Sequence, residues 1–187
     1  KEFTTEVVPP GIRDHTAVER TGDIGLPGIE LAVPMADKGR AGIVYDVVPE
    51  SDLNGAGLLY FARYVAIANY GERLFLRRCS QVELSSRLIR LLATRRRRVF
   101  YFANATEEDS IAISVKAFVS RADEGSSEST TSIAPLKFYF VTELRRQSDG
   151  TLMAKSVAQK HLIIPKRTKS LMFEAERIGQ QLGLRSV

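Results

Sequence analysis

The sequence predicts an α+β fold, in which one antiparallel sheet wraps around a single long buried helix. Residues 58–68 are apolar at almost every position, and a polar, glycine-rich turn at residues 51–57 precedes them. A helix that is apolar on every face has to be covered by the rest of the protein, and this run is too short to cross a membrane. Several β-rich segments follow it, and two of them flank residues 147–150, whose sequence Gln-Ser-Asp-Gly is typical of a hairpin turn.

The segment before the helix is predicted to contain one main strand. Residues 1–40 show no clear periodicity, so we interpret them as an extended leader on the domain surface, with a short strand at Phe3–Val8. Gly42–Pro49 is rich in valine and isoleucine, as strands are. Asn54 or Gly57 is expected to cap the helix that follows, because asparagine and glycine are common at helix starts.

Five segments after the helix have the alternation, or the β-branched and aromatic composition, of strands. An arginine run, Arg95–Arg98, separates the first two of them. We interpret it either as a solvated turn or as a dock for phosphate groups, which guanidinium groups bind through paired hydrogen bonds. Residues 121–134, rich in serine and glutamate, are expected to form a surface loop. The predicted strands are Val82–Leu92, Val99–Ala103, Ser110–Ser120, Leu136–Arg146 and Thr151–Ile164.

The C-terminal segment is predicted to be an amphipathic helix. Apolar residues recur at helical spacing between Lys169 and Leu182, and Gly183 follows as a typical helix end. This helix should pack on the domain or on a partner subunit. The predicted organisation is a leader at 1–40, a globular domain at 41–165 and a helical segment at 166–187.

The strand, the turn and the start of the central helix resemble a known fold family. Asn54-x-x-Gly57 followed by Leu-Tyr-Phe-Ala-Arg-Tyr at 59–64 is similar to the corresponding part of hot-dog acyl-CoA and acyl-carrier thioesterases. In that family the sheet wraps around the helix, and the residue three positions before the turn glycine is usually aspartate. Hot-dog thioesterases of enediyne polyketide pathways carry asparagine there, as this chain does. The resemblance covers residues 42–165.

Three segments resemble a narrower family, the double hot-dog acyltransferase/decarboxylases typified by leinamycin biosynthesis. They are residues 52–62, 98–104 and 148–154. This resemblance implies an enzyme of polyketide-type biosynthesis that acts on acyl-CoA or acyl carrier protein by acyl transfer, with or without decarboxylation. A hot-dog thioesterase and a non-catalytic structural or carrier-binding partner are the alternatives. The chain would hold one hot-dog half, most like the second, so we expect it to pair as a homodimer or with a missing first half.

The turn before the helix is the expected site. Amide N–H groups at a helix start carry partial positive charge and could stabilise the oxyanion that forms when a thioester is attacked. Asn54 is the expected catalytic residue, because its amide can orient the carbonyl or a water, although it is a poor base. Capping alone is the other interpretation of Asn54, and an ion pair is the other interpretation of Arg63. The expected substrate-binding residues are Gly55, Gly57, Leu58, Tyr60, Arg63, Arg97, Arg98 and Asn104.

Composition constrains the partners. Of 187 residues, 44% are hydrophobic and 26% charged, and the net charge is +5. Coenzyme A phosphates or an acidic carrier protein fit this charge. Nucleic acid fits it on charge alone, but we do not expect it as a partner. Cys79 is the single cysteine, which excludes an intrachain disulfide and favours a reducing compartment, so we expect a cytoplasmic protein without membrane association.

The sequence shows no motif for a metal or a redox cofactor. It contains no phosphate loop, dinucleotide fingerprint, paired-cysteine metal site or Gly-x-Ser-x-Gly elbow. His15 and His161 form no recognisable triad with Cys79, and we interpret them as a loop residue and a sheet residue. We expect no metal, and no cofactor beyond the coenzyme A or phosphopantetheine that belongs to the substrate.

Overall fold

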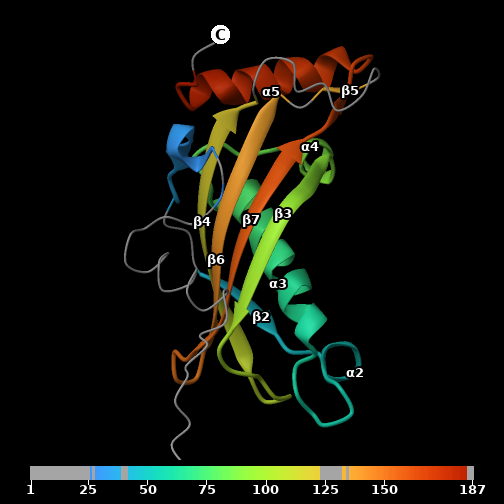
Figure 1. Ribbon diagram of the computed structural model, residues 1–187, viewed down its shortest axis with the longest axis vertical. Coiled ribbons are helices and arrows are strands. Elements are labelled where there is room, and N and C mark those ends of the chain that lie inside the picture. Colours follow the sequence, from blue (N-terminus) through green and yellow to red (C-terminus); the bar gives the residue numbers. More distant parts are fainter. Residues whose placement is uncertain (1–25, 27, 39–41, 123–131, 134, 185–187) are drawn as a thin grey trace, which may run out of the picture.

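A computed structural model describes residues 26, 28–38, 42–122, 132–133 and 135–184. Its main element is one antiparallel sheet, with a long helix lying across one face (Figure 1). The strand order is β1-β4-β6-β7-β3, and β2 also pairs with β4. A two-stranded sheet of β5 (Ser132–Ile133) and β8 (Ile164–Pro165) lies apart from it. The strands of the main sheet are β1 (Val33–Met35), β2 (Ile43–Asp46), β3 (Leu92–Tyr101), β4 (Ser110–Arg121), β6 (Leu136–Arg146) and β7 (Leu152–Leu162).

Most of the predicted strands are confirmed. β4 and β6 match their predicted ranges, and their pairing runs from Ile111 opposite Arg146 to Arg121 opposite Leu136. β6 and β7 are joined by the predicted hairpin turn, whose Gly150 has a φ of 74°. Part of the predicted leader, β1, pairs with β4 at the sheet edge.

The central helix α3 (Phe61–Leu74) contacts β2, β4, β6 and β7 and continues into the π-helical segment η2 (Phe75–Cys79). Two details of the prediction are wrong. The helix begins at Phe61 rather than near Leu58, and the side away from the sheet is exposed, with Phe61 61% and Tyr70 42% accessible. The chain is extended before the helix because Leu59 donates its N–H to the carbonyl of Ala105 instead of entering the first turn.

Gly71 lets α3 approach the sheet closely. A Cβ atom added there would lie 2.5 Å from Cγ2 of Ile113 on β4. This separation is far inside van der Waals contact, so any side chain at position 71 would force the helix or the Ile113 side chain to move. Glycine is unfavourable inside a helix, and here the close packing offsets that cost.

The predicted strand Val82–Leu92 is wrong, because its middle forms the short helix α4 (Ser86–Arg90). Ser85 is the N-cap, and its hydroxyl accepts a hydrogen bond from the N–H of Leu88. Leu88 and Ile89 are both buried. Two adjacent apolar residues that both face the core fit a helix better than a strand, in which neighbours point to opposite faces.

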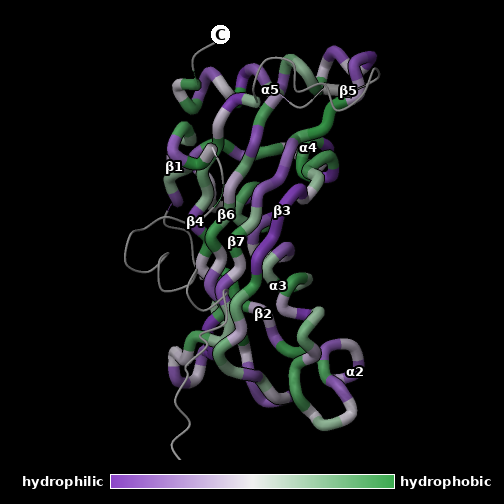
Figure 2. The backbone as a smooth tube through the Cα atoms, in the orientation of Figure 1, coloured by the Kyte–Doolittle hydropathy of each residue, from purple (hydrophilic) through white to green (hydrophobic). Residues whose placement is uncertain are grey.

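The arginine run is also placed differently from the prediction. Arg95–Arg98 lies inside β3 rather than in a turn, and this strand pairs only with β7 among the described strands. Figure 2 shows the run as a hydrophilic stretch along the sheet. A register shift between Thr94 and Arg96 marks a bulge within it.

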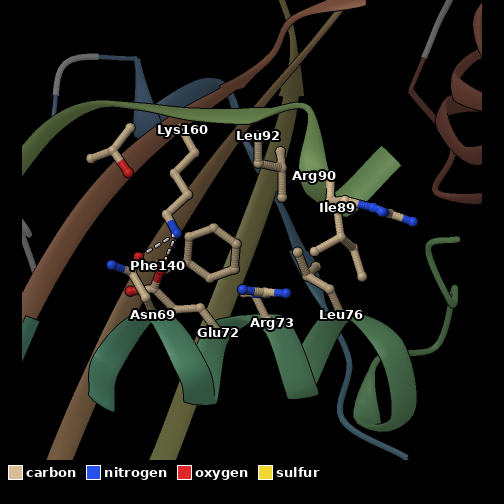
Figure 3. Close-up of a pocket in the computed structure, with 10 residues that line it drawn as sticks. Asn69, Glu72, Arg73, Leu76, Ile89, Arg90, Leu92, Phe140 and Lys160 are labelled. Carbon is tan, nitrogen blue, oxygen red and sulfur yellow. Dashed lines mark hydrogen bonds and ion pairs between the residues drawn. The ribbon is translucent and has the colours of Figure 1, made fainter. Parts of the chain in front are cut away.

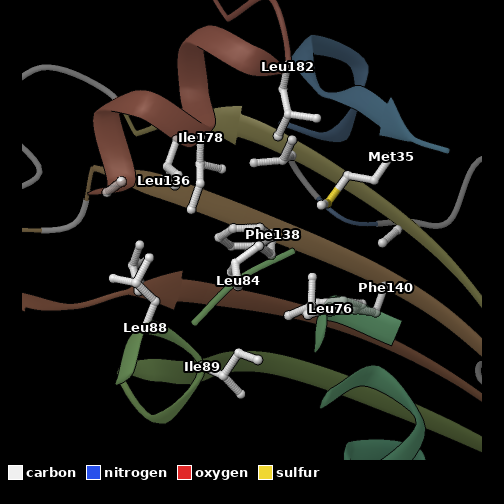
Figure 4. Packing of buried hydrophobic residues seen from close by; sticks show 14 of the residues in the cluster. Met35, Leu76, Leu84, Leu88, Ile89, Leu136, Phe138, Phe140, Ile178 and Leu182 are labelled. Atoms are coloured by element: carbon white, nitrogen blue, oxygen red, sulfur yellow. The ribbon is translucent and has the colours of Figure 1, made fainter. Parts of the chain in front are cut away.

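The C-terminal helix α5 (Lys169–Gln181) is confirmed and packs across one end of the sheet. Its buried residues Ala175 and Ile178 join the larger of the apolar clusters (Figure 4). A second cluster lies toward the other end of α3, around Tyr64 and Ile67. The main residues of the first cluster include Leu76, Leu84, Leu88, Leu136, Phe138, Phe140, Ile178 and Leu182.

Some predictions lie outside the described residues. They are the short strand Phe3–Val8, the loop residue His15 and most of the surface loop 121–134. Among the described helices, none has the length and apolar character needed to cross a membrane.

Candidate functional site

The turn before α3 is closed by Asn54. Its N–H donates to the carbonyl of Leu58 at 2.8 Å, and its own carbonyl accepts from the N–H of Gly57 at 2.9 Å. The side-chain oxygen Oδ1 accepts from the N–H groups of Ala56 at 2.9 Å and Leu58 at 3.2 Å. Gly57 has a φ of 71°, a left-handed conformation that favours glycine. Asn54 therefore stabilises its own turn, and the prediction that Asn54 or Gly57 caps the helix is wrong, since the N-cap residue is Tyr60.

These bonds change which donors are available at the site. The N–H groups of Gly57 and Leu58, two of the expected substrate-binding residues, both donate to Asn54 and are therefore not available to an oxyanion. Because Oδ1 of Asn54 accepts two backbone hydrogen bonds, its NH2 group is the end of the side chain left for other partners. Asn54 is exposed. The first amides of α3, at Phe61 and Ala62, also have no acceptor within the helix.

Asp52 anchors this turn to the strand before it and to the helix after it. It is fully buried, and it accepts hydrogen bonds from the Tyr45 hydroxyl at 2.8 Å and the Val48 N–H at 2.9 Å. The other carboxylate oxygen of Asp52, Oδ1, lies 3.1 Å from the Ser51 hydroxyl and forms an ion pair with Arg63 at 2.6 Å. Burial alone would raise the pKa of this carboxyl. The hydrogen bonds and the arginine charge outweigh burial, so the pKa lies below the ordinary value of 3.8.

Arg63 is therefore engaged in structure. Besides the ion pair with Asp52, Arg63 donates a hydrogen bond to the Tyr45 hydroxyl at 3.3 Å. These contacts raise the pKa of its guanidinium, with the Tyr45 bond as the largest cause. Of the two interpretations of Arg63 from sequence, the ion pair describes its contacts in the structure. The residue positions the turn against α3.

A third segment, residues 103–105, joins the turn to the helix. The Tyr64 hydroxyl lies 2.9 Å from the carbonyl of Ala103 and 3.1 Å from Oδ1 of Asn104. Burial raises the pKa of Tyr64 to about 12, so its hydroxyl stays protonated and acts as a donor. Oδ1 of Asn104 also accepts from the Ala105 N–H, so Asn104, like Asn54, has its NH2 group left for other partners.

Exposed aromatic residues surround this end of α3. The rings of Tyr60 and Phe61 lie 4.5 Å apart, and the Tyr101 ring packs edge-on against Tyr64 at 5.2 Å. Tyr60, Tyr101 and Phe102 are each between 45% and 48% accessible. The amide donors of Asn54 and the helix start thus lie at the edge of an apolar surface.

Arg97 and Arg98 lie elsewhere and do not act together. Arg97 donates to Glu72 at 2.9 Å, to Asn69 at 3.0 Å and to the Ser156 hydroxyl at 2.6 Å. Arg98 is exposed, and strand alternation places it on the opposite face of the sheet from Arg97. One phosphate group cannot contact both side chains. Arg97 is also far from the turn. Its partner Glu72 lies about 16 Å along α3 from Phe61, at a rise of about 1.5 Å per residue.

Comparisons with known proteins give structural matches only. No protein-family model matches the chain, and no curated protein matches it. The 1,4-dihydroxy-2-naphthoyl-CoA thioesterase Slr0204 from Synechocystis is 18% identical, with a TM-score of 0.45, over 67% of this chain and 84% of that one. A thioesterase from Thermus thermophilus, complexed with coenzyme A and Zn, is 16% identical, with a TM-score of 0.46, over 67% and 86%. A hypothetical thioesterase from Streptococcus pneumoniae with coenzyme A is 15% identical, with a TM-score of 0.45, over 74% and 90%.

The architecture described above decides the fold: one antiparallel sheet packs around one long helix that follows the first main strand. The chain has the hot-dog fold. Within this hot-dog domain, the structure brings together Asn54, Gly55, Gly57, Leu58, Tyr60, Arg63 and Asn104 at the start of α3, and it separates Arg97 and Arg98 from them.

Sequence reasoning missed two groups of buried polar residues. One is Asp52, and the other is Glu72 with Lys160, which lie 2.6 Å apart on α3 and β7. A signal for Glu72 was present, because it is one helical turn from both Ala68 and Phe75 on the sheet-facing side. A carboxylate on that side predicts a cation opposite it, but not which one.

Proposed function

We propose that this protein processes acyl thioesters carried on coenzyme A or on the phosphopantetheine arm of a carrier protein. The observation that supports this most directly is the orientation of Asn54. Two backbone N–H groups hold its Oδ1, so that its NH2 group is left as a donor on the turn that precedes α3. A donor in a fixed position suits a carbonyl oxygen that gains negative charge.

In this proposal the thioester carbonyl lies between the Asn54 NH2 group and the first amides of α3. Attack on the carbonyl carbon makes a tetrahedral intermediate, and its oxygen receives these hydrogen bonds. The carbon–sulfur bond then breaks, and the thiol of coenzyme A or of the carrier leaves with the proton that the attacking water or acceptor gives up. Removing one such donor typically lowers the rate by about 10²–10³.

Water is the acceptor that we propose first, which makes the protein a hot-dog thioesterase. Acyl transfer is the second candidate, and the state of Asp52 favours it. This carboxyl is fully buried and paired with Arg63, so it is not available to activate water. An acceptor that brings its own nucleophile needs less help from a base. Decarboxylation and a role in polyketide-type biosynthesis stay predictions of the family resemblance.

We further propose that the site is completed by a second hot-dog domain, from a second copy of this chain or from a separate half. The edge of β3 is open among the described strands, and the outer side of α3 exposes Phe61 and Tyr70. Open strand edges and exposed apolar side chains are both favourable places for pairing.

The test is release of the coenzyme A thiol from a series of acyl-CoA substrates by the wild type, Asn54→Ala and Asn54→Asp. We expect both variants to lose at least about tenfold in kcat/KM, or roughly 1.4 kcal/mol of transition-state stabilisation. Aspartate preserves the acceptor that closes the turn, so Asn54→Asp should unfold as the wild type does. Gln180→Ala is the matched control, because it removes an exposed amide on α5, at the other end of the molecule (Figure 1).

Mass spectrometry of the products separates the two reactions. Free acid identifies hydrolysis, and an acyl adduct on an added carrier or thiol identifies transfer. Absence of thiol release from every thioester, by a folded protein with its partner domain present, would overturn the proposal in favour of a non-catalytic binding role. Wild-type turnover in both Asn54 variants would remove Asn54 from the mechanism.

A further inference from the structure

A cavity lies at the other end of α3 from the Asn54 turn. It has a volume of about 370 Å³ and lies between α3, α4, β3 and β7 (Figure 3). Its size is at the lower end of the range typical of small-molecule sites. Ile89 and Leu92 contribute its accessible apolar surface, and Leu76 and Phe140 also border it but are almost fully buried. Polar and charged side chains line the rest, and the balance of their charges indicates what the cavity can bind.

The buried charges beside the cavity do not cancel. Lys160 and Arg97 both contact the same carboxylate oxygen of Glu72, at 2.6 Å and 2.9 Å. The three side chains are only 7%, 10% and 1% accessible. Two buried cations therefore share one anion, which leaves one positive charge without a counter-charge within this group. Buried charges are normally paired, so an anion from outside the chain would complete the group.

Lys160 has a donor left for such an anion. Its ammonium group has three N–H bonds, and two of them are accounted for by Glu72 and by Oδ1 of Asn69 at 2.8 Å. It lies 5.6 Å above the Phe140 ring and lines the cavity. Burial lowers the pKa of Lys160, and Arg97 lowers it further, which agrees with an excess of positive charge here.

Two more cations line the same cavity. Arg73 and Arg90 belong to its wall, and neither pairs with a carboxylate of the described residues. Arg73 also lowers the pKa of Lys160. The lining therefore combines a cationic part with an apolar part, which is complementary to a molecule with an anionic group and an apolar body.

We infer that this cavity binds a small organic anion, a carboxylate with a short aliphatic or aromatic body. The carboxylate is held by Lys160 and Arg73, and the body packs against Ile89 and Leu92. The same chemistry has two sources, a free carboxylic acid or the carboxylate-bearing end of a long acyl group. The binding inference does not depend on the proposed thioester chemistry, because the cavity lies about 16 Å along α3 from Phe61.

The test is calorimetric titration of the full chain with octanoate and with octan-1-ol, its neutral counterpart. We expect octanoate to bind at least tenfold more tightly than the alcohol, and to weaken as salt is raised. Lys160→Met leaves Glu72 paired with Arg97 and should fold, while octanoate affinity falls at least tenfold and octan-1-ol affinity stays unchanged. Arg73→Gln should lower octanoate affinity several-fold. Arg177→Gln, at an exposed arginine of α5, is the control and should change nothing.

Equal binding of octanoate and octan-1-ol, no binding of octanoate, or full octanoate affinity in a folded Lys160→Met variant would each overturn the inference. Competition identifies the source of the carboxylate. Displacement of octanoate by a long-chain acyl-CoA with a terminal carboxylate, but not by acetyl-CoA, identifies the end of an acyl group. Octanoate binding that neither thioester affects identifies a free acid. None of these measurements uses turnover, so loss of the proposed activity would leave their outcome intact.

Discussion

Replacing Glu72 by glutamine tests the buried charge group directly. The variant keeps the size of the side chain but removes the carboxylate that Lys160 and Arg97 both contact. Removing one partner of a buried ion pair typically costs about 3–5 kcal/mol, because the other charge stays buried without compensation. Arg97 keeps its hydrogen bonds to Asn69 and Ser156 and remains charged. Most of the loss should therefore come from Lys160.

The proton equilibrium of Lys160 limits that loss. One pKa unit is worth about 1.36 kcal/mol, so holding a lysine of ordinary pKa 10.5 neutral at pH 7 costs about 5 kcal/mol. A buried lysine without its carboxylate releases its proton once the penalty reaches this value. We expect Glu72→Gln to lower the free energy of unfolding by about 3–5 kcal/mol at pH 7. That is a large share of the typical 5–15 kcal/mol of a domain.

The stability lost in Glu72→Gln should depend on pH in a direction that the pKa of Lys160 sets. In the variant the folded pKa of Lys160 falls further below its unfolded value, so between the two values the unfolded state binds more protons. Stability then rises with pH by at most about 1.4 kcal/mol per unit. The pKa of Lys160 is lowered less in the wild type, where Glu72 opposes the shift. The difference in unfolding free energy between wild type and variant should therefore shrink from pH 7 to pH 9.

Urea unfolding, followed by circular dichroism at pH 7, 8 and 9, measures these quantities. The double variant Glu72→Gln/Lys160→Met should recover at least about 2 kcal/mol of the loss and abolish its pH dependence, because the charge that lacked a partner is gone. Glu143→Gln is the control, since this carboxylate belongs to partly exposed pairs that are worth about 0–1 kcal/mol. A loss below about 1 kcal/mol in Glu72→Gln, or a loss that Lys160→Met does not relieve, would refute the reasoning.

Packing, acid titration and pairing give three more predictions. Gly71→Ala should lower the free energy of unfolding by about 1–3 kcal/mol through the clash with Cγ2 of Ile113. The same substitution should cost less in an Ile113→Ala background, which lacks that atom, and an unchanged urea midpoint for Gly71→Ala alone would contradict the close approach. The pKa of Asp52 is lowered in the folded protein, so its contribution to the free energy of unfolding is complete above pH 3.8 and is lost as the pH falls through the lower folded pKa. Asp52→Asn should therefore be less stable than the wild type at pH 5, and the difference in unfolding free energy should narrow toward pH 2. Sedimentation at micromolar concentration should show a dimer, and a folded monomer would count against pairing at β3.

The amino-acid sequence was sufficient for the elements whose signal is local. β4 was predicted at nearly its observed bounds because apolar and polar residues alternate along it, and β6 was predicted at its observed bounds because it is rich in aromatic and β-branched residues. The turn at Gly150 and the helix ending near Gly183 were predicted because both positions use the left-handed backbone that glycine adopts easily. The resemblance around Asn54 and Gly57 also indicated the fold and the end of the helix at which the candidate site lies.

Only the tertiary structure decides which atoms of the candidate site residues can still bind another group. Neighbours along the chain show that Asn54 is in a turn, but the direction of its NH2 group depends on two backbone donors that Oδ1 binds. Arg97 and Arg98 are adjacent in sequence, yet strand alternation sends them to opposite faces. Glu72 and Lys160 come together only when α3 packs on β7. Burial makes a charge either costly or useful, and burial is set by contacts between distant segments that no local pattern records.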